Sequence, residues 1–576
     1  MCRSLLPAIL FLTFLILAGC KDKSSGEFGY LGEFINNPQT PPSGLDGKYN
    51  MAADTNRDGA VDTEGSDDYG ENVWNAAQGA VMAYNNDDDN SDSDRDHNDS
   101  LVNGVSDESD LARVVIKQIA DIETGSYAKI ALDADSADCV RLFKNNGASW
   151  SVFNPATDTI TSGELASGDV IFGIESRKYS ETASGEPGLW SGTATLTLTV
   201  YEQGGAVSGT DSLLVRTAPF IMNTNLDSPE RIYVCNSGDN AGFVSDLTTI
   251  AGTIGLPITV ISYTECGGDR WTQDQFEFGS AEMSSDVTPV VLNSPRDRST
   301  LADYPWYYLL GPDFGCLQQS GNTMESLNSF GNLECIPPYG SYPLGRIIVG
   351  GAGTRRMDES VRNFLSAQSM QGPVYELDTT WLAVGHVDEI MSFIPAPNAR
   401  GWVVAWADVD VALDMLEVVP ASTPVFQGTG AATTASVILN DSSLIAFNES
   451  VQTNCLDVLR GRLKADLGLS ESDFVRIPVL WDVEYSPDAR ALAYTAGAVN
   501  WIVIGSHVIV ARQFGPEVGG TDKFEEDITN KLFALGLTAH FIDDWDTYHE
   551  LWGEVHCGTN VLRTLPSSPK WWTTGR

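Results

Sequence analysis

The residues best suited to chemistry lie at positions 553–560, where the sequence Gly-Glu-Val-His-Cys-Gly-Thr-Asn contains Cys557. A thiolate is a strong nucleophile when its surroundings stabilise the anion. The glycines permit a sharp turn whose backbone amides can face a reacting centre. Cys557 is therefore the candidate nucleophile. The alternative is a cysteine that only packs, because free cysteines are among the most buried residue types.

Two further stretches set ionisable side chains among aromatic and apolar residues. Residues 269–279 contain Asp274, and residues 384–397 contain His386 and Asp388. This pattern is expected where charged groups are held at a partly desolvated site, although polar residues satisfied in a core would give it too. His386 and Asp388 are two positions apart, so both point to the same face if the segment is extended.

One thiol, one imidazole and two carboxylates suit a reaction on a guanidinium group. Two carboxylates can hold the planar cation through paired, charge-assisted hydrogen bonds, which leaves its central carbon open to a thiolate. The imidazole can then protonate the departing nitrogen and later activate water. The set therefore predicts covalent chemistry on a guanidinium substrate.

The three motifs closely resemble the catalytic motifs of the peptidylarginine deiminases, calcium-dependent enzymes that convert protein arginine to citrulline. Matching motifs at residues 311–315, 329–334 and 570–572 follow the family order, and the resemblance covers most of the chain from about residue 45. It implies a calcium-dependent deiminase that acts on arginine-containing proteins or peptides.

The resemblance also implies a role for each site residue. Asp274 and Asp388 would clamp the guanidinium. Cys557 would attack its carbon to give a covalent thiouronium intermediate. His386 would protonate the leaving ammonia and then activate the hydrolytic water.

Two substrate contacts follow from the same resemblance. Trp271 would form a wall against the aliphatic stem of arginine, and Arg298 would bind the substrate backbone, which distinguishes a peptide from free arginine. A second basic contact is missing, because Leu551 and Trp552 stand where it is expected. Two alternatives therefore stay open: a deiminase or amidinotransferase acting on small guanidino compounds, and a non-catalytic calcium-binding surface lipoprotein.

Calcium is the cofactor that the resemblance implies, and two sites would lie near the catalytic motifs. The second site would bind more weakly, because two amides replace expected acids and calcium affinity depends on ligand charge. The expected ligands are Gln273, Glu277, Glu334 and the carbonyls of Phe330 and Leu333 for the first site, and Gln275, Asn293, Ser294, Asp297 and Asp313 for the second and its surroundings.

An acidic region nearer the N-terminus predicts further calcium ligands. Residues 54–62 place oxygen-bearing side chains at alternating positions before a glycine, so that a turning loop can aim several oxygens at one ion. A solvated acidic loop is the alternative. The resemblance adds ligands in residues 85–110, although Arg113 stands where the family has an acid. The candidates are Asp54, Asn56, Asp58 and Asp62, and then Asn85, Asp87, Asp89, Asp99 and Asp110.

Hydrophobic patterning predicts a chain with a β-rich part followed by an α/β part. Residues 193–200 alternate strictly, as a half-buried strand does, and Gly- and Ser-rich segments separate such runs. Later segments alternate between amphipathic helices, at 360–370, 455–467 and 524–535, and apolar strands. The resemblance implies an immunoglobulin-like β-sandwich middle domain at residues 45–215 and an α/β-propeller (pentein) catalytic domain at residues 216–576.

The N-terminal segment predicts export. Residues 1–20 combine a positive charge, an apolar run and small residues before Cys20, as in a signal peptide. Leu-Ala-Gly-Cys also resembles the bacterial lipobox, which implies lipid attachment at Cys20, a tether over residues 21–44 and a place in the cell envelope, with the outer membrane favoured.

Composition limits the partners. With 34 Lys and Arg against 78 Asp and Glu, the formal net charge is −44. This charge disfavours nucleic acid and favours cationic substrates and divalent metals. Outside the N-terminal segment seven of the nine cysteines remain, an odd number that leaves at least one thiol free if all bridges form within the chain.

Overall fold

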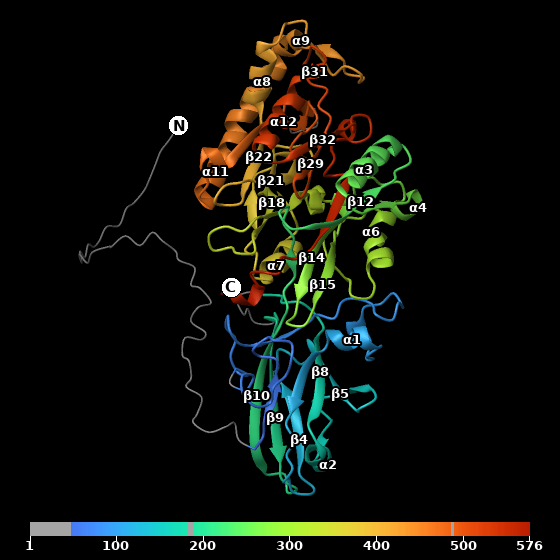
Figure 1. The fold of residues 1–576 in the computed structure, drawn as a ribbon, viewed down its shortest axis with the longest axis vertical. Helices are drawn as coiled ribbons and strands as arrows, with labels where there is room; N and C mark the ends of the chain where they lie inside the picture. The colour runs from blue at the N-terminus through green and yellow to red at the C-terminus, as the bar shows by residue number, and fades with distance from the viewer. Residues whose placement is uncertain (1–47, 69, 183–188, 485–488) are drawn as a thin grey trace, which may run out of the picture. The chain divides into compact units, whose positions relative to one another are not determined.

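The computed structural model describes residues 48–68, 70–182, 189–484 and 489–576 (Figure 1). The predicted signal segment, Cys20 and the tether lie outside the described residues. Within the described ranges, no helix combines the length and the apolar character that crossing a membrane requires.

Two five-stranded sheets form the β-rich part and enclose one hydrophobic core. Strand β9 (Thr193–Tyr201) alternates between intermediate and buried residues along its whole length, as the sequence predicts. One sheet has the order β1 (Met51–Ala53), β3 (Ala112–Ile116), β8 (Val170–Ser176), β5 (Val140–Asn145) and β6 (Trp150–Phe153). The other has the order β2 (Ala80–Met82), β10 (Val207–Thr217), β9 (Thr193–Tyr201), β4 (Tyr127–Leu132) and β7 (Ile160–Thr161).

Five modules of one topology follow in the described part of the chain. In each module a first strand pairs antiparallel with a second, and the second pairs parallel with a third that follows at least one helix. The modules are β33 (Thr559–Arg563), β12 (Pro229–Cys235) and β13 (Ile258–Ile261); β14 (Phe276–Glu282), β15 (Val287–Asn293) and β16 (Gly315–Gln318); β17 (Leu333–Ile336), β18 (Arg346–Ala352) and β20 (Tyr375–Leu377); β21 (Met391–Pro395), β22 (Trp402–Asp408) and β25 (Phe474–Pro478); and β28 (Ile502–Ile504), β29 (His507–Ala511) and β32 (Thr538–Ile542).

Five repeated modules of this kind make up an α/β-propeller. The predicted fold class is therefore confirmed. The first module is completed from the far end of the chain, because β33 follows all four other modules and pairs with β12. The helices that cross between paired strands include α3 (Ala241–Ile254), α6 (Thr300–Tyr304), α7 (Glu359–Ala367), α8 (Val409–Val418), α11 (Asp457–Leu467) and α12 (Lys523–Ala534).

The predicted helices occur with small shifts at their ends. α7 stops at Ala367 and not at Met370, because Ser369 has a positive φ of 68° that no helix continues through. α11 ends at Leu467, and Gly468 follows it with a φ of 66°, the left-handed C-cap that the sequence indicates. α12 begins where the Asp522 side chain accepts from the N–H groups of Phe524 and Glu525.

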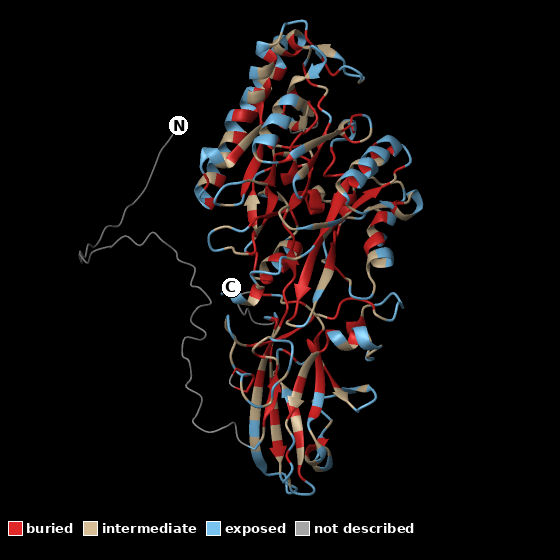
Figure 2. Ribbon diagram, in the orientation of Figure 1, coloured by how far each residue is buried: buried red, intermediate tan, exposed pale blue. Residues whose placement is uncertain are grey.

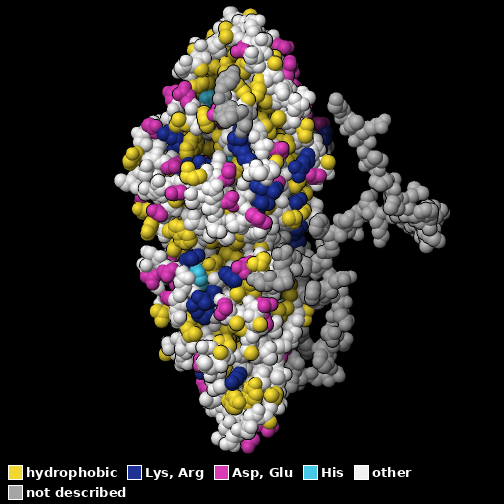
Figure 3. Space-filling model, turned by 180° about the vertical axis from the view of Figure 1, so that it is seen from behind, with side chains coloured by type: hydrophobic (Ala, Val, Ile, Leu, Met, Phe, Trp, Pro, Cys, Tyr) yellow, Lys and Arg dark blue, Asp and Glu magenta, His cyan; other side chains and the backbone are white. Residues whose placement is uncertain are grey.

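The cores of the modules lie in their strands. Figure 2 shows that these strands are largely buried, whereas the helices expose one side to solvent. On the face shown in Figure 3, Asp and Glu side chains are dispersed among Lys and Arg and do not gather in one patch. The acidic net charge is therefore not concentrated on that face.

Candidate active site

The loop that leads into the first strand of a module carries the candidate catalytic residues. Asp274 lies two residues before β14, Cys557 two residues before β33, and Asp388 three residues before β21. These loops occupy the same position in modules of the same topology. The fold therefore brings together residues that are far apart in the sequence.

Cys557 is a free, buried thiol that lies beside a carboxylate. Its Sγ is 3.5 Å from Asp388 Oδ2, and its side chain is in no disulfide. Burial, followed by the charges of Asp388 and Asp274, raises the pKa of the Cys557 thiol well above its usual value. A cation held by these two carboxylates would offset their charges and favour the thiolate.

Asp388 is held by a histidine that sequence reasoning did not assign to the site. His556 Nδ1 lies 2.9 Å from Asp388 Oδ2, and His556 Nε2 lies 3.3 Å from Glu334 Oε1. Burial alone would lower the pKa of His556, but the hydrogen bond to Asp388 and the charge of Glu334 raise it to about 9. The only signal for this role in the sequence is the position of His556 next to Cys557.

Asp274 is paired with an arginine of the chain itself. Arg298 donates from Nη2 to Asp274 Oδ2, and its Nη1 lies 3.3 Å from Asp269 Oδ2. The Arg298 side chain is nine-tenths buried. The second oxygen of Asp274, Oδ1, has no hydrogen-bond partner among the described residues and stays available to a ligand.

His386 presents one specific ring nitrogen to the site. Its Nε2 lies 3.0 Å from the carbonyl oxygen of Ser326, an acceptor only, so Nε2 carries the hydrogen. Its Nδ1 is buried, lies 3.7 Å from Asp274 Oδ1 and has no hydrogen-bond partner in the described structure. The backbone N–H of His386 donates to Glu389 Oε1, which fixes the loop. Nδ1 is therefore the atom that can exchange a proton with a ligand.

Gly331 marks the point on which three of the functional groups converge. A Cβ at Gly331 would lie 2.7 Å from His386 Nδ1 and 3.0 Å from both Asp274 Oδ1 and Asp388 Oδ2. These atoms thus surround a space that any side chain at Gly331 would enter. The sequence places Gly331 in a matching motif without indicating this role.

The predicted ligands of the first calcium site lie together. Gln273, Glu277 and Glu334 line one cavity of about 30 Å³, and the Phe330 carbonyl accepts from Gln273 Nε2 at 3.3 Å. Leu333, the other carbonyl candidate, begins β17 next to Glu334. Burial raises the pKa of Glu277 and that of Glu334 to about 7. Two buried carboxylates, an amide and a carbonyl form an oxygen set that fits calcium.

The predicted ligands of the second calcium site do not all lie together. Gln275 Nε2 donates to Asn293 Oδ1 at 2.8 Å, and the Gln275 carbonyl accepts from Ser294 N–H at 2.7 Å. Asp297 accepts from Ser299 N–H at 2.8 Å. Asp313 lies elsewhere, because its charge contributes to the raised pKa of Asp87 in the β-rich part of the chain. The structure therefore separates Asp313 from the amide pair.

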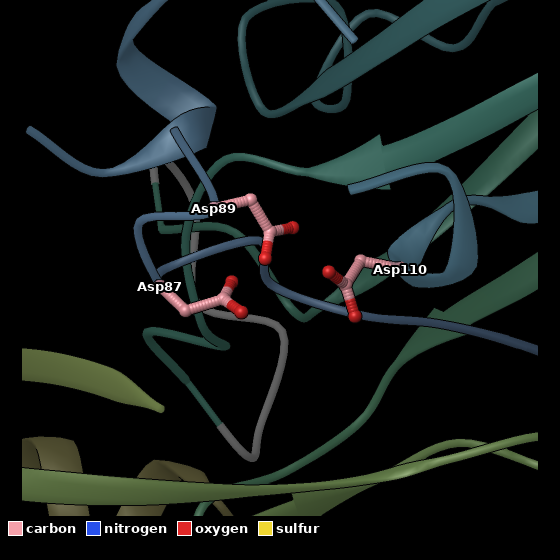
Figure 4. Close-up of side chains that lie close together, drawn as sticks. All are labelled: Asp87, Asp89 and Asp110. Carbon is pink, nitrogen blue, oxygen red and sulfur yellow. The ribbon is translucent and has the colours of Figure 1, made fainter. Parts of the chain in front are cut away.

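Carboxylates of the β-rich part form a second oxygen cluster. Asp87, Asp89 and Asp110 point toward one another, with one oxygen of each within 4.8 Å of the others (Figure 4). Burial, followed by the charge of a neighbouring aspartate, raises the pKa of Asp87 and of Asp110. A group of the same kind contains Asp89 with Asp96 and Asp107, two residues that sequence reasoning missed.

Two other candidates, Asn85 and Asp99, lie beside these carboxylates. Asn85 donates from Nδ2 to Asp107 and Glu175 at 3.0 Å, and its Oδ1 has no hydrogen-bond partner in the described ranges. Asp99 accepts from Leu101 N–H at 2.7 Å. Arg113, where the family has an acid, pairs with Glu108 at 2.6 Å.

The turn at residues 54–62 is stabilised by side chains of the loop that accept hydrogen bonds from its own backbone. Asp54 accepts from the N–H groups of Asp58 and Gly59 at 3.0 Å, and Asn56 Oδ1 accepts from Asp58 N–H at 2.9 Å. Asp62, at the end of the loop, donates from its N–H to Asp67 Oδ2. Its acids join neither of the clusters described above.

Trp271 lies beside the loop that carries Cys557. A Cβ at Gly553 would lie 2.4 Å from the Trp271 ring, and that ring packs edge-on against Tyr548 at a centroid distance of 5.7 Å. Trp271 therefore forms a wall next to Gly553.

Comparisons with known proteins identify the family of the chain. The family model described as protein-arginine deiminase (PAD) matches residues 207–573. Mouse protein-arginine deiminase type-3 is 35% identical over 87% of this chain and 78% of its own length, and human type-4 is 32% identical over 97% and 88%. Human type-3 is 39% identical, but the match spans only 56% of its length and 63% of this chain.

Solved structures with a related arrangement include C. jejuni agmatine deiminase, with a TM-score of 0.37, 12% identity and coverage of 60% of this chain and 96% of that one. The sequence matches extend through every catalytic motif and, for two relatives, through the β-rich part as well. The chain therefore belongs to the protein-arginine deiminase family.

Proposed function

We propose that this protein hydrolyses peptidyl-arginine to peptidyl-citrulline and ammonia in a calcium-dependent reaction. The observation that carries the proposal is the convergence of Asp274 Oδ1, Asp388 Oδ2 and His386 Nδ1 around Gly331, with Cys557 Sγ 3.5 Å from Asp388. Family membership supports the same activity.

The two carboxylates select a cationic substrate. Asp274 and Asp388 are both buried, and one oxygen of each has no hydrogen-bond partner among the described residues, which is costly. A guanidinium between them would supply donors to these two oxygens and would replace the charge of Arg298 at Asp274. Neutral citrulline loses this attraction, which favours product release.

The reaction proceeds in two balanced halves. Cys557 sulfur forms a bond to the guanidinium carbon, His386 gives a proton from Nδ1 to one terminal nitrogen, and the carbon–nitrogen bond breaks with loss of ammonia. His386 then takes a proton from water, whose oxygen adds to the same carbon. The added hydroxyl group gives up its remaining proton, which ends on the released ammonia as ammonium, while the carbon–sulfur bond breaks, the thiolate returns and citrulline leaves.

The candidate ligands of the first calcium site would hold an ion that organises the site and takes no part in these bonds. Gln273, Glu277 and Glu334 with the Phe330 carbonyl would bind it, and the ion would neutralise the charges of the two glutamates. Because His556 contacts both Glu334 and Asp388, ion binding is coupled to the position of a clamp carboxylate. Asp87, Asp89 and Asp110 would hold ions in the β-rich part.

The protein would act at the cell envelope on arginine-containing proteins or peptides. This part of the proposal rests on the lipobox-like sequence before Cys20. A lipid-modified N-terminus would hold the enzyme at a membrane, and the outer membrane is the location proposed. Membrane fractionation of cells expressing the wild type and Cys20→Ala tests it.

A second candidate is a deiminase for small guanidino compounds. The observation in its favour is the apolar pair Leu551 and Trp552 in place of a basic contact, with the side chain of Trp552 about half exposed. Arg298 favours the peptide reaction, since it offers a guanidinium for the substrate backbone once it leaves Asp274.

Citrulline release from a blocked arginine peptide tests the proposal directly. We expect release in calcium, none in chelator, and none from Cys557→Ser under either condition. Free arginine serves as the competing substrate and Cys455→Ser as the matched control. Release that is equal in wild type and Cys557→Ser would end the proposal.

A further inference from the structure

Asn500 occupies, in the fifth module, the position that carries a functional residue in two others. It lies two residues before β28, the first strand of its module, as Asp274 lies before β14 and Cys557 before β33. It lies outside the motifs on which the sequence analysis based the family resemblance. The repeat of the fold nevertheless brings its side chain to the same site.

The contacts of Asn500 are concentrated on the nucleophile loop. Its backbone carbonyl accepts from His556 N–H at 3.0 Å, and its Oδ1 accepts from Cys557 N–H at 3.2 Å. One residue thus holds two successive backbone amides, that of the nucleophile and that of its neighbour. The donor at Cys557 also fixes the orientation of the Asn500 amide, because Oδ1 must face that N–H.

This orientation leaves the Asn500 amide nitrogen without a partner. Nδ2 makes no hydrogen bond among the described residues, although the side chain is only 3% exposed. An unsatisfied buried donor destabilises the folded state, so such a group is expected where something pairs with it during function. Asn500 and Cys557 line the same cavity of about 30 Å³.

The surroundings of Cys557 need a donor of this kind. Cys557 is buried and its Sγ lies 3.5 Å from Asp388 Oδ2, so negative charge on the sulfur is disfavoured unless a donor pairs with it. A sulfur that must become an anion beside a carboxylate gains from a nearby neutral N–H, because that donor adds no repulsion for a cationic substrate.

We propose that Asn500 is a further catalytic residue, whose Nδ2–H donates a hydrogen bond to Cys557 sulfur whenever that sulfur carries negative charge. Its Oδ1 meanwhile holds the Cys557 backbone in place. The role of this hydrogen bond in turnover rests on the deiminase function proposed above. Its effect on the reactivity of the sulfur does not.

Two substitutions separate the donor from the acceptor. Asn500→Asp keeps an oxygen for Cys557 N–H but loses the Nδ2 donor, and Asn500→Leu loses both without adding a charge. For each we measure kcat and KM on a blocked arginine peptide, the rate at which iodoacetamide alkylates Cys557 at fixed pH in calcium, and the midpoint of thermal unfolding. Asn500→Gln, which restores both groups, measures rescue.

We expect kcat to fall about a hundredfold in Asn500→Asp and Asn500→Leu with KM within threefold, as for the loss of one donor to a developing anion. Alkylation of Cys557 should slow in both, and Asn500→Gln should recover part of each rate. If Asn500→Leu does not fold, Asn500→Ala takes its place.

Three results would overturn the inference. Normal alkylation and kcat in Asn500→Asp would leave only the Oδ1 contact with a role. Normal rates in Asn500→Leu with slow rates in Asn500→Asp would assign the effect to added charge. Slow turnover with unchanged alkylation in both variants would show that Asn500 does not act through a hydrogen bond to the sulfur. If the wild type releases no citrulline, the proposed function fails, and the alkylation rates still decide the role of Asn500.

Discussion

Arg298 donates a hydrogen bond to Asp274 Oδ2, so one of the two carboxylates expected to bind the substrate guanidinium is already paired with a guanidinium of the chain itself. A substrate must displace Arg298 from Asp274 or share that carboxylate with it. Once displaced, Arg298 is free to bind the backbone of a peptide. The same arginine can therefore disfavour free arginine and favour peptides.

Replacement of Arg298 by glutamine should lower the selectivity for peptides. Free arginine then meets an unpaired Asp274, while a peptide loses its backbone contact. We expect the ratio of kcat/KM for a blocked peptide to that for free arginine to fall about tenfold, which corresponds to ~1.4 kcal/mol. Arg362→Gln, which removes a surface ion pair with Glu376, is the control. An unchanged ratio would show that Arg298 does not discriminate.

Replacement of Glu334 by glutamine should weaken activation by calcium. The substitution removes one of two buried carboxylates from the predicted site, and calcium affinity depends on ligand charge. We expect the calcium concentration for half-maximal citrulline release to rise about tenfold or more. Glu359→Gln, at an exposed position in the first turn of α7, should leave it unchanged. Equal shifts in both variants would assign the effect to net charge.

The sequence predicts the catalytic residues because each lies in a short contiguous motif. Cys557 is marked by its neighbours, and so are His386 and Asp388. Asn500 has no such marker, since its role depends on a loop of the fifth module meeting the loop that precedes β33. Gly331 is similar, because only the positions of three other side chains show why its Cβ must be absent.

The fold, like the site, contains features that the local sequence predicts and features that it does not. Alternation along Thr193–Tyr201 predicts β9 well, since the side-chain period of a strand is a local property. The pairing of β33 with β12 joins opposite ends of the propeller and leaves no local signal. The family resemblance, and not the hydrophobic pattern, therefore supplied the propeller as an expectation.

Replacement of Asp544 by asparagine should stabilise the protein at alkaline pH. Burial, followed by the charge of Glu554, raises the pKa of Asp544 well above its usual value, and neither of its carboxyl oxygens has a hydrogen-bond partner in the described structure. A raised folded-state pKa means that stability is complete below the unfolded pKa of ~3.9 and is lost as pH rises through the folded pKa.

An amide at position 544 does not ionise and can donate to Glu554. We therefore expect the free energy of unfolding of Asp544→Asn to exceed that of the wild type by about 1–3 kcal/mol at pH 8.5 and by much less at pH 5. Urea unfolding at both pH values measures the difference. A gain that is the same at both would mean that ionisation of Asp544 has no part in it.

Replacement of Gly331 by alanine should abolish turnover and leave the fold intact. The new methyl group would lie 2.7 Å from His386 Nδ1 and 3.0 Å from Asp274 Oδ1 and Asp388 Oδ2, in the space that the substrate guanidinium needs. The φ of Gly331 is not positive, so alanine fits the backbone. We expect kcat/KM to fall at least a hundredfold, since small displacements of reacting groups have effects of this size.

Gly461→Ala in α11, where the added methyl would meet nothing within 4 Å, should keep full activity. Near-normal turnover by Gly331→Ala would mean that the guanidinium binds elsewhere and that the clamp of Asp274 and Asp388 is not the substrate site.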